Sequence, residues 1–174
     1  RFNAWAKYFN WQHDDKIGSL MAKSAESQEF RPLFDKKPVV LEGGSIDTNG
    51  QGTLLTTEEC LLSTTQQRNP GMKRKDYEKV FAEYLGISNV IWLNNGICGD
   101  DTHGHVDDLT RFVAPDTVVT AVESDPGEDN YEALRENIRR LRSATDESGQ
   151  PLAIVDLPMP APVIFEGQRL PASY

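Results

Sequence analysis

Residues 99–108 concentrate side chains that can move protons. This segment holds two of the three histidines in the 174-residue chain, together with four aspartates. His105 and Asp107 are two positions apart, which on an extended segment would place both side chains on one face. An imidazole beside a carboxylate has its charged form favoured, which suits proton transfer near neutral pH. We therefore predict that His105 and Asp107 act together in a catalytic site; the alternative is a solvated acidic loop with an incidental histidine.

The other polar residues of this kind have simpler interpretations. Asp100, Asp101 and Asp108 are typical of residues that cap, turn or solvate a loop. His103 is either a neighbour of the site or an exposed residue. His13 precedes two aspartates and is expected on the surface at the start of a helix.

A second candidate is Glu42, which follows the apolar run 38–41 and precedes Gly43 and Gly44. A carboxylate within a buried strand is costly unless it has a partner. Paired glycines allow a ligand or another backbone to approach closely. These features predict that Glu42 points into a pocket; the alternative is an ordinary glutamate at a strand bulge, with the glycines serving the backbone.

The order Thr-His-Gly-His-Val-Asp at residues 102–107 also looks like the zinc motif of the metallo-β-lactamase fold. That motif continues with His, whereas this chain has Asp108. Its further metal ligands are downstream histidines, and no histidine follows His105. A dinuclear zinc site therefore cannot be completed from this chain.

Neither cysteine is a good candidate for a nucleophile. Cys60 follows Glu58 and Glu59, and neighbouring acids raise the pKa of a thiol, so Cys60 is interpreted as a buried structural thiol. Cys98 is followed by two aspartates, at positions 100 and 101, which are equally unfavourable for a thiolate. The two thiols form no CxxC pair or zinc spacing, which favours a reducing compartment, and we expect a cytoplasmic protein.

The charge balance narrows the choice of partners. Lysine and arginine number 18 against 27 aspartates and glutamates, and the formal net charge is −9. An acidic surface repels phosphate backbones and anionic lipids, so we expect neither nucleic acid nor a membrane surface as a partner. No apolar run approaches the roughly 18 residues of a membrane span. The acidic character suits a small cationic substrate.

Hydrophobic periodicity and turn residues predict a mixed α/β chain. Residues 1–11, rich in aromatics, are interpreted as a strand end or an ordered loop. Asn49-Gly50 predicts a type I′ hairpin turn. We expect helices over about 14–25, 73–85 and 125–141, a helical turn over 58–62, and strands over 30–34, 38–41, 45–47, 53–56, 89–93, 111–114, 117–121 and 152–156.

The expected elements repeat in the order strand, strand, helix, strand. The two copies cover about 39–93 and 106–156, and their closing strands lie 63 positions apart. Glu42 and His105 are also 63 positions apart. The offset suits modules of a propeller-like α/β fold, in which both residues would face one centre.

Several stretches resemble agmatine deiminases and their bacterial-type peptidylarginine deiminase relatives. The match runs in order along the chain, and its motifs are long. One departure is His103, where that family often has Asp. The stretches that carry the resemblance are Leu-Glu-Gly-Gly-Ser-Ile at 41–46, residues 50–62, Arg-Asn-Pro at 68–70, Val-Ile-Trp-Leu at 90–93 and residues 99–107.

This resemblance implies a pentein fold, a five-bladed α/β propeller of ββαβ modules around a central site. It implies hydrolysis of the guanidinium group of agmatine to N-carbamoylputrescine and ammonia through a cysteine thiouronium intermediate. His105 would be the general acid and base, and Glu42 and Asp107 would bind the guanidinium group. No metal and no cofactor is expected. The expected partner is a small cationic guanidino substrate. The resemblance leaves open whether the protein forms a homo-oligomer.

The resemblance also implies that the chain is an internal part of a larger catalytic domain. The family's nucleophile lies in a Gly-rich segment ending Ile-His-Cys, and a further site aspartate lies near its N-terminus; neither segment is found in residues 1–174. We expect about three of five modules and no activity from the chain alone. The alternatives are a peptidylarginine deiminase-like enzyme and a non-catalytic pentein that serves as a binding module.

Overall fold

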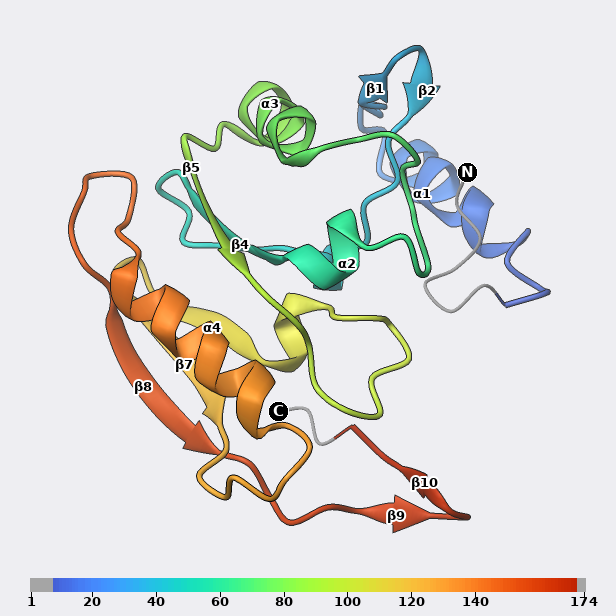
Figure 1. The fold of residues 1–174 in the computed structure, drawn as a ribbon. Helices are drawn as coiled ribbons and strands as arrows, with labels where there is room; N and C mark the ends of the chain where they lie inside the picture. The colour runs from blue at the N-terminus through green and yellow to red at the C-terminus, as the bar shows by residue number, and fades with distance from the viewer. Residues whose placement is uncertain (1–7, 172–174) are drawn as a thin grey trace.

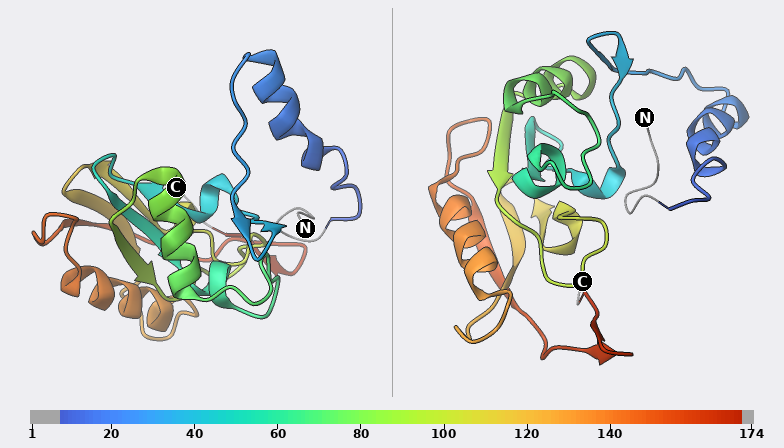
Figure 2. Two further views of the ribbon diagram at one scale, coloured as in Figure 1. Left: turned by 90° about the horizontal axis from the view of Figure 1, so that it is seen from above. Right: turned by 45° about the vertical axis from the view of Figure 1, so that its right-hand side comes forward.

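The structure, a computed structural model, describes residues 8–171 as two three-stranded sheets with helices packed on them (Figures 1 and 2). Seven of the eleven residues of the aromatic-rich stretch 1–11 lie outside the described residues. The helices are α1 (Asp14–Ser24), η1 (Gly43–Ser45), α2 (Glu58–Leu62), α3 (Arg74–Leu85), η2 (Val106–Asp108) and α4 (Tyr131–Ser143). The strands are β1 (Leu33–Phe34), β2 (Lys37–Pro38), β3 (Asp47–Thr48), β4 (Thr53–Thr57), β5 (Asn89–Leu93), β6 (Thr110–Ala114), β7 (Thr117–Val122), β8 (Ala153–Pro158), β9 (Ile164–Phe165) and β10 (Gln168–Arg169).

The predicted ββαβ repeat is confirmed for two modules. In each module the first two strands are antiparallel, and the strand after the helix pairs in parallel with the second strand. Thr53 and Asn89 begin the parallel register of the first module, and Thr117 and Ala153 begin that of the second. Each residue of the second pair comes 64 positions after its counterpart in the first, one more than the sequence pattern indicated.

Strand β4 is buried on both faces, and this fixes how the two modules pack. Its side chains alternate in direction, as in any strand. Leu54 belongs to the core under α3, together with Tyr77 and Phe81. Leu55 belongs to the other core, to which α4 contributes Leu134. Helix α4 contacts β7 of the second sheet and β5 of the first, so it links the two sheets (Figure 1).

Helix α3 shows how closely local signals determine an element. Its apolar positions recur at helical spacing, and Tyr77, Val80 and Phe81 are buried against the first sheet. Gly86 ends the helix in the left-handed conformation, with φ of 70°, as the sequence predicted.

Two expected elements are wrong, and the strand expected over 45–47 begins only at Asp47, because Gly43–Ser45 forms the 3-10 helix η1. Residues 38–41 do not form a buried strand, because the backbone N–H and C=O of Val40 bond to the side chain of Asn69, at 2.8 and 2.7 Å, instead of a neighbouring strand. Asp125 does not begin a helix with Pro126. Its side chain accepts a hydrogen bond from the Gly127 amide at 2.8 Å and forms a turn, so α4 begins only at Tyr131.

The expected hairpin between β3 and β4 exists, but its turn is not of type I′. That turn needs positive φ at two successive residues, whereas only the glycines at 50 and 52 have it. Asn49 instead accepts hydrogen bonds from the backbone amides of Gln51, Gly52 and Thr53 at 2.9–3.1 Å.

Outside the two modules, α1 and the β1–β2 hairpin precede the first sheet and the β9–β10 hairpin follows the second (Figure 1). Strand β1 occupies only the end of the strand expected over 30–34. Helix α1 has no buried residue, and its apolar residues Ile17, Leu20 and Met21 are exposed. Within residues 8–171 no helix has both the length and the apolar character that crossing a membrane requires.

Candidate active site

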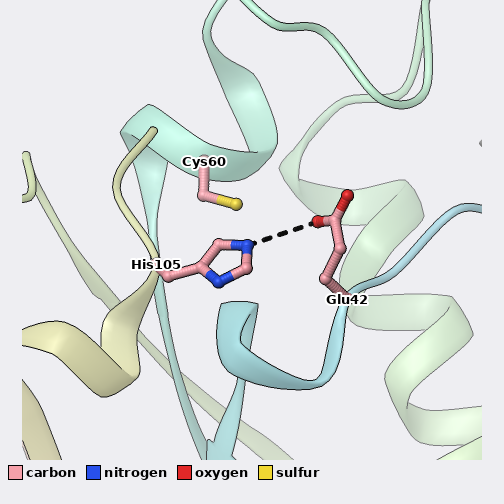
Figure 3. Close-up of side chains that lie close together, drawn as sticks. All are labelled: Glu42, Cys60 and His105. Carbon is pink, nitrogen blue, oxygen red and sulfur yellow. Dashed lines mark ion pairs between the residues drawn. The ribbon is translucent and has the colours of Figure 1, made fainter. Parts of the chain in front are cut away.

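Glu42 and His105 occupy equivalent positions in the two modules. Glu42 is the residue before the short 3-10 helix η1, and His105 is the residue before η2. The two 3-10 helices contact each other. Consequently the side chains meet: Glu42 Oε2 lies 3.5 Å from His105 Nε2, and both side chains are more than nine-tenths buried (Figure 3).

Asp107 lies on the other side of the imidazole. The prediction that 105–107 is extended is wrong, because Val106–Asp108 is a 3-10 helix whose Val106 is fully buried. Asp107 nevertheless approaches the ring, with Oδ1 3.9 Å from His105 Nδ1. Its side chain is 35% exposed, against 7% for His105, so the site opens toward solvent at Asp107.

Gly44 makes this approach of the two modules possible. A Cβ added there would lie 2.6 Å from His105 Nδ1 and 2.7 Å from Asp107 Oδ2, distances that real Cβ atoms do not tolerate. Gly43 is different, because an added Cβ would meet nothing within 4 Å. The expectation that the glycine pair serves a close approach is therefore confirmed for Gly44, and the group that approaches is the predicted catalytic pair.

Arg68 holds Glu42 in place. Its Nε donates to both carboxylate oxygens of Glu42 at 3.2 Å, and the two side chains form a buried ion pair. Its Nη1 reaches the carbonyls of Cys60 and Gln66 at 3.5 and 3.3 Å, and its Nη2 donates to the carbonyl of Thr102 at 2.5 Å. One guanidinium group thus connects Glu42 to α2 and to the histidine-rich segment.

The ionised form of Glu42 is favoured by these neighbours. Burial by itself would raise the pKa of Glu42, but the contacts with His105 and the positive charge of Arg68 outweigh it, and the pKa lies below its ordinary value. The carboxylate is therefore ionised at neutral pH. The Nε2 atom of His105 is buried and has no hydrogen-bond partner among the described residues, because its 3.5 Å separation from Glu42 lacks hydrogen-bond geometry.

The loop that carries the histidines, residues 94–105, is held by side chains from both modules. Asn137 of α4 accepts from one loop amide and donates to one loop carbonyl, at 2.7 and 2.8 Å. Glu59 accepts from another loop amide at 2.7 Å. Thr57 Oγ1 donates to the carbonyl of Gly104 at 2.5 Å, directly before His105. These bonds fix the backbone from which the imidazole projects.

The remaining polar residues of this segment are largely structural, as predicted. Asp100 accepts hydrogen bonds from the backbone amides of Thr102 and Gly104, each at 2.7 Å, and so forms the turn. His103 has positive φ and lies 3.7 Å from a Glu59 oxygen. Asp108 is half-buried, and desolvation together with the charge of Asp100 raises its pKa to about 6.

Cys60 lies closer to the site than its sequence suggested. Burial raises the pKa of this thiol to about 12, so the interpretation as a poor nucleophile stands, although desolvation rather than its acidic neighbours is the main cause. Its Sγ, an oxygen of Glu42 and a ring nitrogen of His105 all lie within 4.8 Å of one another. Figure 3 shows the three side chains converging. Neither this position of Cys60 nor the role of Arg68 was predicted.

Comparison with known proteins places the chain in a family. The family described as Porphyromonas-type peptidyl-arginine deiminase matches residues 1–174. The chain belongs to this family. Among curated proteins of similar sequence, the agmatine deiminase of Pseudomonas aeruginosa (strain LESB58) is 38% identical over 167 residues, which cover 93% of this chain and 44% of that protein.

Solved structures of proteins described as agmatine deiminases share the fold. The structure of a cysteine-to-serine variant of the C. jejuni agmatine deiminase with substrate bound has a TM-score of 0.85 and 32% identity, covering 100% of this chain and 49% of that one. The agmatine deiminase of Enterococcus faecalis has a TM-score of 0.84 and 35% identity, covering 99% and 50%. This member of the Porphyromonas-type family spans about half the length of the curated relatives it matches.

Proposed function

We propose that this chain supplies part of the active site of an enzyme that hydrolyses the guanidinium group of agmatine to a ureido group with release of ammonia. The observation that carries the proposal is the meeting of Glu42 and His105, from equivalent turns of two modules, with Asp107 at the open side of the ring. The names of the similar proteins support the same chemistry.

In this proposal Glu42 and Asp107 bind the substrate. Both carboxylates face the imidazole from opposite sides, and charge-assisted hydrogen bonds to guanidinium N–H groups are among the stronger ones. The positive charge of Arg68 offsets the negative charge of Glu42. Asp107 has no cationic neighbour of this kind among the ion pairs of the described residues, so it adds the negative charge that attracts a cation.

His105 moves the protons. In its charged form it donates a proton to the departing ammonia, and in its neutral form it takes a proton from the water that attacks the same carbon. Water enters, ammonia leaves, and the guanidinium carbon ends with a C=O bond. The burial of His105 between two carboxylates limits competition from bulk water at this step.

The nucleophile in this proposal is a cysteine thiolate outside residues 1–174, which attacks the guanidinium carbon and forms a thiouronium intermediate. The chain is then about three of five pentein modules of a larger catalytic domain, and on its own it would not turn over substrate. The cysteine-to-serine variant of the C. jejuni relative, solved with substrate bound, is compatible with such a cysteine.

An ammonia-release assay on the full-length protein that contains these residues tests the proposal. Agmatine and an arginine-containing peptide are compared at equal concentration, because the family description names peptidyl-arginine whereas the similar proteins are agmatine deiminases. We expect release from agmatine, with the ureido product identified by mass. Release of ammonia only from the peptide would show that the substrate is peptidyl-arginine and not agmatine. Binding of agmatine without turnover would favour a non-catalytic pentein.

A further inference from the structure

We propose that Glu42, Cys60 and His105 form a binding site for one thiophilic divalent metal ion of the Zn²⁺ class, and that the bound ion blocks the guanidinium site. The three side chains come from η1, α2 and the residue before η2, and they converge in Figure 3. Thiolate, imidazole and carboxylate are the ligand types that Zn²⁺ takes in proteins.

The geometry needs little adjustment. A tetrahedral Zn²⁺ with bonds of roughly 2.0–2.3 Å holds its ligand atoms about 3.3–3.7 Å apart. Glu42 Oε2 and His105 Nε2 are already 3.5 Å apart, and all three ligand atoms lie within 4.8 Å of one another. A contraction around Cys60 of no more than about 1.5 Å completes the set. Three protein ligands leave the fourth position for water.

His105 provides an independent indication of a ligand. Its side chain is more than nine-tenths buried, and its Nε2 has no hydrogen-bond partner among residues 8–171. Nδ1 on the other side of the ring faces Asp107 Oδ1 at 3.9 Å. A carboxylate that accepts the other ring N–H is the usual outer neighbour of a metal-bound imidazole, and Asp107 is the residue on that side of the ring.

The charges around the ion balance. Arg68 contacts both oxygens of Glu42, so it keeps Oε1 when Oε2 turns to the metal. With Cys60 as a thiolate, the three negative charges of Glu42, Cys60 and Asp107 offset the ion and Arg68. The cluster, of which only Asp107 is partly exposed, is therefore neutral once the metal is bound, which limits the cost of burying the other charges.

Binding must release a proton. The metal–sulfur bond forms as the Cys60 S–H bond breaks, and the proton leaves to solvent.

The consequence for turnover rests on the proposed function, whereas the binding itself does not. The ion takes Glu42 Oε2 and His105 Nε2, the groups assigned to the guanidinium and to proton transfer. Metal and substrate are then mutually exclusive. If the protein proves not to be a deiminase, the spectroscopic test below still decides whether the site exists.

The test is a Cd²⁺ titration of the reduced full-length protein, followed by the ultraviolet thiolate-to-cadmium band and by proton release. We expect one ion and one proton per chain with the appearance of the band. Cys60→Ala and Cys60→Ser should abolish the band, and Cys98→Ser should keep it, because Cys98 lies outside the cluster. Zn²⁺ should inhibit competitively against substrate, and Cys60→Ser should weaken that inhibition at least tenfold.

The absence of a band in the wild type would overturn the proposal, and so would a band of unchanged affinity in the Cys60 variants, which would place the ion on another thiol. Should the Cys60 variants fail to fold, Glu42→Gln and His105→Gln decide instead. Each removes one ligand and should lower Cd²⁺ affinity at least tenfold while the band persists at saturation. Unchanged affinity in both would refute the site.

Discussion

Gly44 lies against His105 so closely that a Cβ at position 44 would come within 2.6 Å of the imidazole Nδ1. This contact joins the turn that follows Glu42 to the side chain that we assign to proton transfer. It makes a glycine, which has no side chain to offer the reaction, a determinant of the site's geometry.

Gly44→Ala should therefore impair turnover without a comparable loss of folding. The added methyl group must displace His105 or Asp107, and a misplacement of about 1 Å can cost roughly a hundredfold in rate. Gly43→Ala is the matched control, because nothing lies within 4 Å of an added Cβ there. The measurement is kcat/KM for agmatine in the full-length protein. Equal activities of the two variants would contradict the assigned role of the contact.

His105→Ala should reduce kcat by about a hundredfold to ten-thousandfold, the range that general acid–base catalysis contributes. The substrate should still bind, because Glu42 and Asp107 remain. Equilibrium binding of agmatine to the variant, measured by calorimetry, separates the two effects. Ordinary turnover by His105→Ala would remove this residue from the mechanism.

Arg68→Lys should destabilise the protein by about 2 kcal/mol. Lysine keeps the positive charge but cannot contact a carboxylate and three carbonyls from one planar group, and a buried partner left unpaired is costly. Arg31→Lys is the control, because the Arg31–Glu29 pair is exposed and should contribute less than about 0.5 kcal/mol. Denaturant unfolding of the two variants measures the difference. Equal unfolding midpoints would show that Arg68 does not hold Glu42 in position.

The raised pKa of Asp108 predicts a pH-dependent stability. The folded state holds the Asp108 proton up to about pH 6, whereas the unfolded chain releases it near its ordinary value of 3.8. The contribution of Asp108 to stability should thus fall as pH rises from about 4 to 6 and stay lower above that range. Asp108→Asn removes this ionisation. Relative to the wild type, its free energy of unfolding should be about 1 kcal/mol more favourable at pH 7.5 than at pH 4, after allowance for solvent screening.

Thermal unfolding at the two pH values measures this gain. Asp116→Asn, at an exposed turn, serves as the control and should shift the unfolding temperature equally at both. A gain from Asp108→Asn that is the same at pH 4 and pH 7.5 would show that the ionisation of Asp108 does not oppose folding.

The elements whose signals are local could be predicted from the sequence. Helix α3 with its stop at Gly86, strand β5 and the module order all follow from hydrophobic periodicity and turn residues. Residues 38–41 could not be assigned this way, because the side chain of Asn69, some 30 residues later, takes the hydrogen bonds of Val40 that a strand would use.

The candidate site, too, could be predicted only where its signals are local. Glu42 and His105 could be singled out from their local sequence, and the repeat with a 63-position offset then linked them. Arg68 and Cys60 were not, because nothing around them indicates burial beside Glu42. Arg68 lies in a polar loop, and its partners come from three separate segments.

The equivalence of Glu42 and His105 has a meaning for how such a centre can arise. Two copies of one backbone pattern deliver a side chain to the same point in space, and only the identity of that side chain differs. One copy supplies a fixed charge and the other a group that can gain and lose a proton. Division of labour between duplicated units thus requires no new architecture, only a different residue before the same short turn.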